Sequence, residues 1–328
     1  MEIVNNGLLA AFDVAPDGAA RVIGWDEIDA PIAPQHWRWV HFHRNSAEAQ
    51  AWLLDGDVPP NGAAWALMAE DTRPRFAALD GGDVLFLRGI NLNPGSEPED
   101  MVSLRLFVNE THIASVALRN QNALDGLIED CREGEAPGSP GAFIETLVRD
   151  LHFEVEPVLD ELQQIIEQRE FDALDDKSQI DPGARAAFID ARQDAVMLKR
   201  HLVPQAAAIR EIVRRNPGWI DSAEALTEEA VAFERVVEDL DSLRERAQVI
   251  REEMSVRQSE RMNETMMILS IVSVIFLPIT FVTGLMGMNV GGLPLSASPY
   301  GFWVVCALMA ICIIVAGGLV WWILRRRG

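Results

Sequence analysis

Charge is almost absent from the C-terminal part of the chain. Between Met262 and Leu324, Glu264 is the single residue of type Asp, Glu, Lys or Arg. Two apolar runs fill this region, 266–286 with 21 residues and 302–324 with 23. About 20 apolar residues cross the ~30 Å hydrocarbon core of a bilayer, where a charged side chain costs several kcal/mol. The two runs therefore predict two membrane-spanning helices and disfavour a buried hairpin of a soluble protein.

Lys and Arg are also absent from segment 287–301, which joins the two runs. Arginines flank the runs on their other sides: Arg251, Arg257 and Arg261 precede the first, and the tail 325–328 holds three more. Basic residues next to membrane spans stay on the cytoplasmic side. We therefore expect both termini to be cytoplasmic and 287–301 to form a short external loop.

Cysteine is scarce, and the motifs of several enzyme classes are missing. Cys131 stands alone, and Cys306 and Cys312 are six positions apart, which matches no metal-binding or redox spacing. The sequence contains no Gly-rich phosphate loop and no recognisable nucleophile–base pair. It therefore predicts no cofactor and argues against an enzyme.

Acidic residues dominate the region before the membrane spans. All 50 acidic residues and 25 of the 28 basic ones precede residue 265, which leaves that region with a formal net charge of −25. Such a field repels nucleic acid and concentrates cations, although solubility alone is also a sufficient reason for it. We expect cations, and no nucleic acid, as partners.

Short runs typical of strands alternate with turns in residues 1–135. The expected strands are 7–14, 37–42, 83–90, 102–108 and 112–116. Helical segments are expected at 48–54 and 63–70. This pattern predicts an α/β domain with a partly mixed sheet, followed by a linker at 134–141 that contains Pro137 and Pro140.

Helical spacing dominates after residue 142. Apolar residues recur at helical intervals from Phe143 to Ile166, with a kink expected at Pro157. We assign 142–220 to a helical stalk. Pro and Gly are absent from 221–277, so one helix is expected over 222–286, including the first span. Heptad-like spacing in it predicts packing against other helices, at Leu226, Ala230, Phe233, Val237, Leu240, Leu243, Ala247, Ile250 and Met254.

A row of mostly small or hydroxylated residues follows the same helix into the membrane. We name this row the small-residue stripe; its members are Asn263, Met266, Ser270, Ser273, Leu277, Thr280, Gly284 and Gly287. Small residues let membrane helices pack closely. Alternatively the stripe lines a narrow pore, with Met266 and Leu277 as hydrophobic constrictions. One helix cannot enclose a pore, so the second interpretation requires a ring of protomers.

The end of this helix carries a family resemblance. Residues 277–289 read Leu-Pro-Ile-Thr-Phe-Val-Thr-Gly-Leu-Met-Gly-Met-Asn and are followed by a short loop and the second span. Together with the long helix and the acidic α/β domain, this run resembles the CorA-type divalent-metal transporters. The family's signature is a Gly-Met-Asn tripeptide at the outer end of the first of two C-terminal spans.

Three further segments resemble the ZntB branch, the zinc-transporting relatives. They are Glu-Asp-Thr-Arg-Pro-Arg-Phe at 70–76, Leu-Arg-Gly-Ile-Asn at 87–91 and Asn-Val-Gly-Gly-Leu-Pro at 289–294. Magnesium-type members usually carry an acidic residue in the outer loop, and 287–301 has none. The resemblance therefore implies transport of Zn²⁺, and of Co²⁺, Ni²⁺ or Cd²⁺, across the inner membrane of a bacterium.

The resemblance also implies an assembly and a set of roles. It implies a funnel-shaped homopentamer in which Gly287, Met288 and Asn289 form the outer selectivity ring. Amide oxygens from five Asn289 side chains would bind a hydrated cation firmly enough to select it and weakly enough to release it; a helix C-cap is the alternative role of this residue. The remaining members of the small-residue stripe are implied to line the pore.

Two weaker site predictions concern metal-binding residue types. His41 and His43 share one face of an expected strand, a spacing that can chelate Zn²⁺, but no third ligand is evident nearby. An acidic vestibule at the inner mouth is the other prediction, against a plain solvated helix face; its members are Glu252, Glu253, Glu260 and Glu264. A CorA-type Mg²⁺/Co²⁺ channel and a membrane-tethered coiled-coil sensor or scaffold remain the alternative functions.

Overall fold

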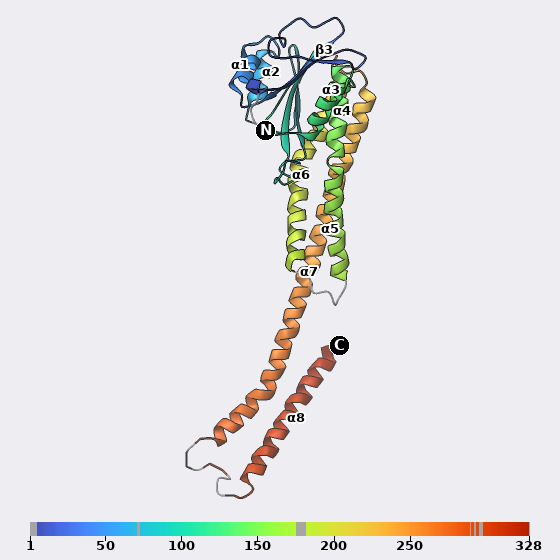
Figure 1. Cartoon of the computed structure of the whole chain (residues 1–328). Coiled ribbons are helices and arrows are strands. Elements are labelled where there is room, and N and C mark those ends of the chain that lie inside the picture. The colour runs from blue at the N-terminus through green and yellow to red at the C-terminus, as the bar shows by residue number, and fades with distance from the viewer. Residues whose placement is uncertain are drawn as a thin grey trace. The chain divides into compact units, whose positions relative to one another are not determined.

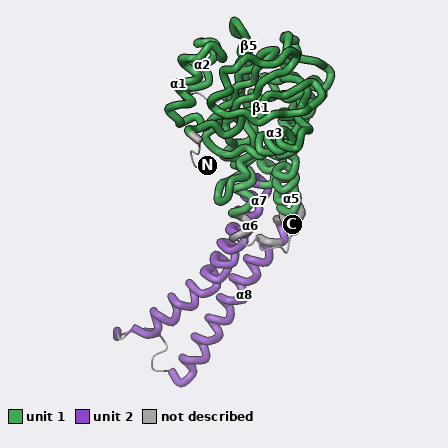
Figure 2. Tube along the Cα trace, turned by 45° about the horizontal axis from the view of Figure 1, so that its top comes forward, with its two compact units in different colours: residues 1–250 green, residues 251–328 purple. Residues whose placement is uncertain are grey.

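The computed structural model describes residues 5–70, 73–174, 182–288, 290–291, 293–294 and 298–327 (Figure 1). The chain divides into two compact units, Met1–Ile250 and Arg251–Gly328 (Figure 2). The α/β part and the helices that follow it up to Ile250 thus belong to one compact unit, and segment 134–141 does not separate two units. One helix, α7 (Ala223–Met286), has residues in both units.

A seven-stranded mixed sheet forms the centre of the first unit, in the order β2-β1-β3-β7-β6-β5-β4. Its strands are β1 (Leu8–Val14), β2 (Ala20–Val22), β3 (Trp37–His43), β4 (Arg75–Leu79), β5 (Gly82–Gly89), β6 (Val102–Val108) and β7 (His112–Ala117). All neighbours are antiparallel except β3 and β7, which run parallel. The α/β fold class with a partly mixed sheet is confirmed; the edge strands β2 and β4 were not expected.

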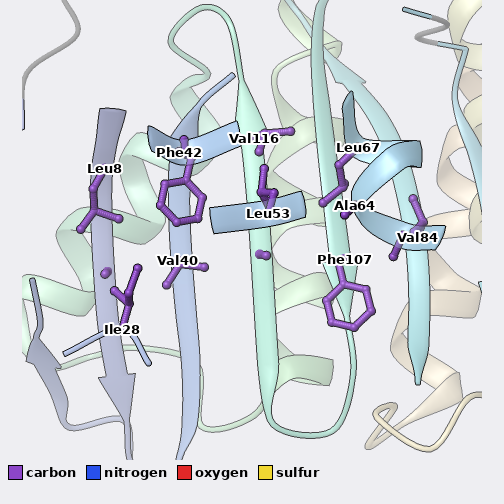
Figure 3. Close-up of a cluster of buried hydrophobic side chains, with 14 of the residues drawn as sticks. Leu8, Ile28, Val40, Phe42, Leu53, Ala64, Leu67, Val84, Phe107 and Val116 are labelled. Carbon is purple, nitrogen blue, oxygen red and sulfur yellow. The ribbon is translucent and has the colours of Figure 1, made fainter. Parts of the chain in front are cut away.

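Helices α1 (Ala47–Asp55) and α2 (Asn61–Met68) cover one face of the sheet. Their Leu53 and Leu67 pack against Phe42, Val116 and other fully buried strand residues (Figure 3). Ser46 begins α1, because its side-chain oxygen accepts a hydrogen bond from the Ala49 amide at 3.2 Å. Alternation along β3 sends Val40 and Phe42 to this face, and Trp39 and His41 to the other.

Aromatic side chains on the other face pack against α4 (Pro140–Phe153). The Phe143 ring lies 4.7 Å from Trp39 and 5.7 Å from Trp37, edge-on to both. Ser139 caps α4 by accepting from the Ala142 amide, so the helix begins inside the expected linker. The preceding helix α3 (Asn122–Glu133), which was not expected, ends at Gly134 with φ of +81°, a conformation that glycine adopts without strain.

The helical stalk expected at 142–220 contains most of α4, together with α5 (Glu156–Leu174) and α6 (Pro182–Arg215), and the first part of α7 packs beside it. The expected kink at Pro157 is a full break, since α4 ends at Phe153 and α5 starts at Glu156. Ion pairs join the helices, including Lys199–Asp241 and Arg210–Glu234 between α6 and α7. Along α7 the buried residue is Val236, whereas the expected heptad residue was Val237. The spacing of buried residues is therefore three from Phe233 to Val236 and four from Val236 to Leu240.

A half-buried carboxyl predicts pH-dependent stability in this unit. Burial raises the pKa of Glu154, which accepts from Gln121 Nε2 at 2.8 Å, from 4.5 to about 7. A carboxyl with a raised pKa stabilises the fold below about pH 4.5 and loses this contribution as pH rises through 7. Glu154→Gln, which keeps an acceptor oxygen without the charge, should therefore raise the Tm of the full chain by about 3 °C at pH 8 but not at pH 5.

Thermal unfolding of both proteins in detergent at pH 5, 6, 7 and 8 measures this difference. Glu161→Gln, at an exposed position of α5, is the matched control and should follow the wild type throughout. Parallel curves for wild type and Glu154→Gln would contradict the prediction.

Candidate ion path

Apolar side chains are exposed along both helices of the second unit. One helix of this unit is the C-terminal part of α7, and the other is α8 (Gly301–Arg327). Each is long and apolar enough to cross a membrane. Leu277 is 75% exposed, and Phe302 and Ile314 are similarly open. A contiguous apolar surface of this extent is unfavourable in water and is typical of a surface in contact with lipid or with another chain.

Half-buried residues mark one face of each of these two helices, which run side by side in both views (Figures 1 and 2). On α7 they are Ile271, Ile275, Pro278, Ile279, Val282 and Met286. On α8 a row spaced three and four apart contains Val305, Met309, Cys312 and Val320 together with the buried Ala316; Gly301, Cys306 and Gly317 are also half-buried. The spacing predicts that the two rows pack on each other within the unit.

The small-residue stripe lies on the opposite side of α7 from the half-buried row. Its residues from Asn263 to Gly287 are all exposed within the chain. At 3.6 residues per turn, Leu277 and Gly284 lie about half a turn away from Ile275 and Val282. The stripe is therefore not used for packing α7 against α8 of the same chain, which leaves it for contact with lipid, with other chains or with a pore.

The hydroxyl groups of the stripe donate to their own helix. Ser270 Oγ donates to the carbonyl of Met266 at 2.8 Å, and Ser273 Oγ donates to Leu269 at the same distance. Thr280 Oγ1 donates to Phe276 at 2.9 Å. Each hydroxyl hydrogen is thus engaged inside the helix, and the oxygen lone pairs remain as acceptors. An acceptor surface suits a cation that keeps its hydration water.

A proline changes the backbone in the middle of the first span. Pro278 has no N–H and cannot donate to the carbonyl of Val274, four residues earlier. An open surface depression of about 490 Å³ lies at this point, lined by Leu277, Pro278, Thr280 and Phe281. The two predicted pore residues Leu277 and Thr280 therefore border the same depression on the surface of α7.

The predicted selectivity tripeptide follows directly after α7. The Gly287 amide donates to the Thr283 carbonyl at 2.9 Å, and a Cβ at Gly287 would lie 3.1 Å from that same oxygen. A side chain at 287 would crowd this carbonyl, so the tight helix end favours glycine. Met288 is 47% exposed. Asn289 and Gly292 lie outside the described residues.

The predicted acidic vestibule is partly neutralised by neighbouring arginines. Its four glutamates are exposed on α7. Glu253 pairs with Arg257 at 2.9 Å, one helical turn away. Arg251 and Arg261 lie in the same stretch, so three arginines accompany four glutamates between 251 and 264. The local excess of negative charge is therefore small in a single chain.

The two strand histidines are part of the core of the first unit. His41 and His43 are 3% and 6% exposed, and His41 Nδ1 lies 2.9 Å from Ser115 Oγ. Burial lowers the pKa of His41 to about 4. Among the residues that the structure describes, no group of three or more His, Cys, Asp or Glu side chains is placed to hold a metal ion. The pair gains no third ligand from the fold.

Comparison with known proteins places these features in a family. Residues 34–326 match the model of the CorA-like Mg²⁺ transporter proteins. The chain belongs to the CorA family. It is a divalent-cation transporter and not an enzyme, and its two C-terminal helices are transmembrane.

Two relatives cover nearly the whole of this CorA-family transporter. The divalent cation transporter CmaX of Pseudomonas aeruginosa is 36% identical over 98% of this chain and 96% of its own. The zinc transport protein ZntB of Pectobacterium carotovorum is 30% identical over 99% of this chain and 97% of its own. Both relatives span the α/β domain, the stalk and the two membrane helices.

Solved structures have the same fold. The full-length CmaX structure superposes with a TM-score of 0.84, at 34% identity and 98% coverage of both chains. The CorA magnesium transporter of Methanocaldococcus jannaschii gives a TM-score of 0.76 at 17% identity, which supports the fold alone. The predicted architecture of α/β domain, long stalk and two apolar helices is therefore confirmed.

Proposed function

We propose that this CorA-family transporter is a homopentamer that conducts Zn²⁺, together with Co²⁺, Ni²⁺ or Cd²⁺, along an axis lined by five copies of α7. It resides in the inner membrane of a bacterium with both termini in the cytoplasm. The observation that carries the proposal is the small-residue stripe, which is exposed within the chain and presents hydroxyl acceptors opposite the α8-facing row. In a ring of protomers, the face of α7 that carries the small-residue stripe lies toward the central axis of the ring.

Exposed apolar residues on the stalk support self-association. Ile189, Val196 and Val203 recur at seven-residue intervals on α6 and are 44%, 46% and 42% exposed. Residues at this interval share one face of a helix, and such a row is typical of a surface that contacts another helix. The chain has a mass of 36.3 kDa, so a pentamer has a protein mass of about 182 kDa, five times that value.

The residues of the outer loop favour Zn²⁺ over Mg²⁺ as the transported ion. The loop 287–301 has no acidic residue. Mg²⁺ holds its water strongly and is usually bound through one or two carboxylates, and this loop offers none. One of the full-length relatives is named as a zinc transport protein, and the family model is named for Mg²⁺.

Flux measurements on purified protein in liposomes test this function. Zn²⁺ and Mg²⁺ uptake are followed with and without a pH gradient, after mass measurement in detergent establishes the oligomer. Zn²⁺ uptake by a pentamer is expected. Mg²⁺ uptake driven by membrane potential alone would instead make this a magnesium channel, and a dimer without flux would indicate a membrane-tethered scaffold.

A threonine within the stripe offers a more local test. Thr280→Val keeps the shape of the side chain and removes the acceptor oxygen, so Zn²⁺ flux should fall about three- to tenfold without loss of assembly. Thr283→Val is the matched control, because Thr283 makes the same type of bond to Ile279 but lies off the stripe. Equal flux through both variants would remove Thr280 from the ion path.

A further inference from the structure

A basic cavity lies in the first unit. Its volume is about 320 Å³. The residues that matter for its chemistry are Arg44, Arg88, Ser103, Arg105, Arg119 and His201. They come from three strands or strand ends, from the residues after β7, and from α6. These residues are far apart in the sequence and form no recognisable motif.

The cavity occupies a position where open α/β sheets commonly bind ligands. Arg44 directly follows β3, and Arg119 comes two residues after β7, the parallel neighbour of β3. After β3 the chain enters α1 on one face of the sheet, and after β7 it enters α3 on the other (Figure 1). Ligands in such sheets bind outside the carboxyl ends of strands where successive connections leave to opposite faces.

Positive charge is concentrated in this cavity, although the protein as a whole has a formal net charge of −22. Four arginines line it, against the two carboxylates Glu99 and Asp100. Burial and the nearby charge of Arg200 lower the pKa of Arg88, as expected where like charges are crowded. This local excess of positive charge attracts anions.

Contacts with backbone carbonyls hold the guanidinium groups in position. Arg105, which is 1% exposed, donates through Nη1 to the Leu67 and Ala69 carbonyls at the end of α2. Arg44 Nη2 donates to the Met68 carbonyl at 2.9 Å, and Arg88 Nη1 donates to Met101 at 2.5 Å. Arg44, Arg88 and Arg105 are therefore ordered before any ligand binds, which reduces the entropy lost on binding.

Three residues of the cavity also carry polar atoms that are buried without a partner. Arg44 Nε, Ser103 Oγ and His201 Nδ1 have no hydrogen-bond partner in the part of the chain that the structure describes. Buried polar groups in proteins are almost always paired, with protein, water or a bound group. Each of these atoms can donate a hydrogen bond, the histidine in its Nδ1–H tautomer. Three donors on residues that line one cavity suit an anion with several oxygens.

We propose that this cavity binds a small anion through a phosphate group. Phosphate presents up to four acceptor oxygens and two negative charges, and guanidinium groups match its geometry. Arg44, Ser103 and His201 would donate to its oxygens, and Arg119 would add charge at the rim. Because His201 belongs to α6 and Arg44 follows β3, the bound anion would tie the stalk to the sheet within the first unit.

Calorimetric titration of the full-length protein in detergent with inorganic phosphate, and separately with AMP, tests the proposal. Saturable binding is expected to weaken about tenfold in Ser103→Ala, the effect of one lost charge-assisted hydrogen bond. Ser103→Ala should leave thermal stability unchanged, because Ser103 Oγ has no partner among the described residues. Arg119→Ala should weaken binding similarly.

The control is Arg132→Ala, an exposed arginine of α3 that pairs with Glu129 at 3.3 Å. It should bind phosphate like the wild type. Tighter binding of AMP than of phosphate would indicate an organic phosphate as the ligand, and the reverse would indicate free phosphate; both support the site. Equal affinity in Ser103→Ala and wild type would overturn the proposal, as would chloride displacing phosphate at equal concentration.

Discussion

Asn289→Ala is expected to abolish Zn²⁺ flux while the protein still assembles. In the proposed pentamer this change removes five amide oxygens from the outer mouth of the pore and leaves no other polar side chain in the tripeptide. A divalent cation that enters a narrow apolar pore needs such oxygens to offset its partial dehydration. We expect flux to fall about 100-fold, which corresponds to about 2.7 kcal/mol of lost stabilisation of the permeating ion.

Zn²⁺ uptake into liposomes that contain equal amounts of wild-type or variant protein measures this effect. Val290→Ala is the matched control, since Val290 is the next residue, is 58% exposed and has no oxygen in its side chain. Size-exclusion chromatography with mass determination should give the same oligomer for all three proteins. If Asn289→Ala conducts as well as the wild type, Asn289 has no part in selecting the ion.

Phe143→Ala should strongly destabilise the first unit. Phe143 is 0% exposed and lies edge-on to Trp37 and Trp39, so it joins α4 to the sheet. Truncation of a buried phenylalanine costs about 3–5 kcal/mol, because it loses the burial of the ring and leaves a cavity. For a unit of this size we expect the Tm to fall by about 10 °C.

Thermal unfolding of the full chain in detergent, followed by the near-ultraviolet signal of the tryptophans, measures this change. Phe153→Ala on the same helix is the control, because Phe153 is 54% exposed and should shift the Tm by a degree or two at most. Similar losses for the two variants would mean that α4 does not depend on the Phe143 contact with the sheet.

Local patterns were sufficient for the long elements of this fold. The scarcity of charge between Met262 and Leu324 predicts both spans, because hydrocarbon excludes charge whatever the tertiary structure. The absence of Pro and Gly from 221–277 predicts one helix, and α7 runs from Ala223 to Met286. The small elements were not predicted: β2 has three residues, and β4 contains two alanines, so neither carries a strong strand signal.

Side-chain partners required the tertiary structure. Val236 and Val237 are adjacent and chemically identical, and only the packing of α7 against the stalk buries the first. His41 and His43 share a face, as expected, but that face is covered, and His41 bonds to Ser115 on the neighbouring strand β7. A sequence pattern gives the face of a strand but does not reveal what covers it.

The sequence by itself determined that this chain is a two-span CorA-family transporter with an α/β domain and a helical stalk. Hydrophobic length, charge distribution and the Gly-Met-Asn tripeptide are local properties that need no knowledge of distant contacts. Tertiary structure decided which side of α7 faces α8, and therefore that the small-residue stripe is exposed within the chain. It also gathered four arginines from positions 44, 88, 105 and 119 into one cavity, because strand order and not sequence distance sets which strand ends are neighbours.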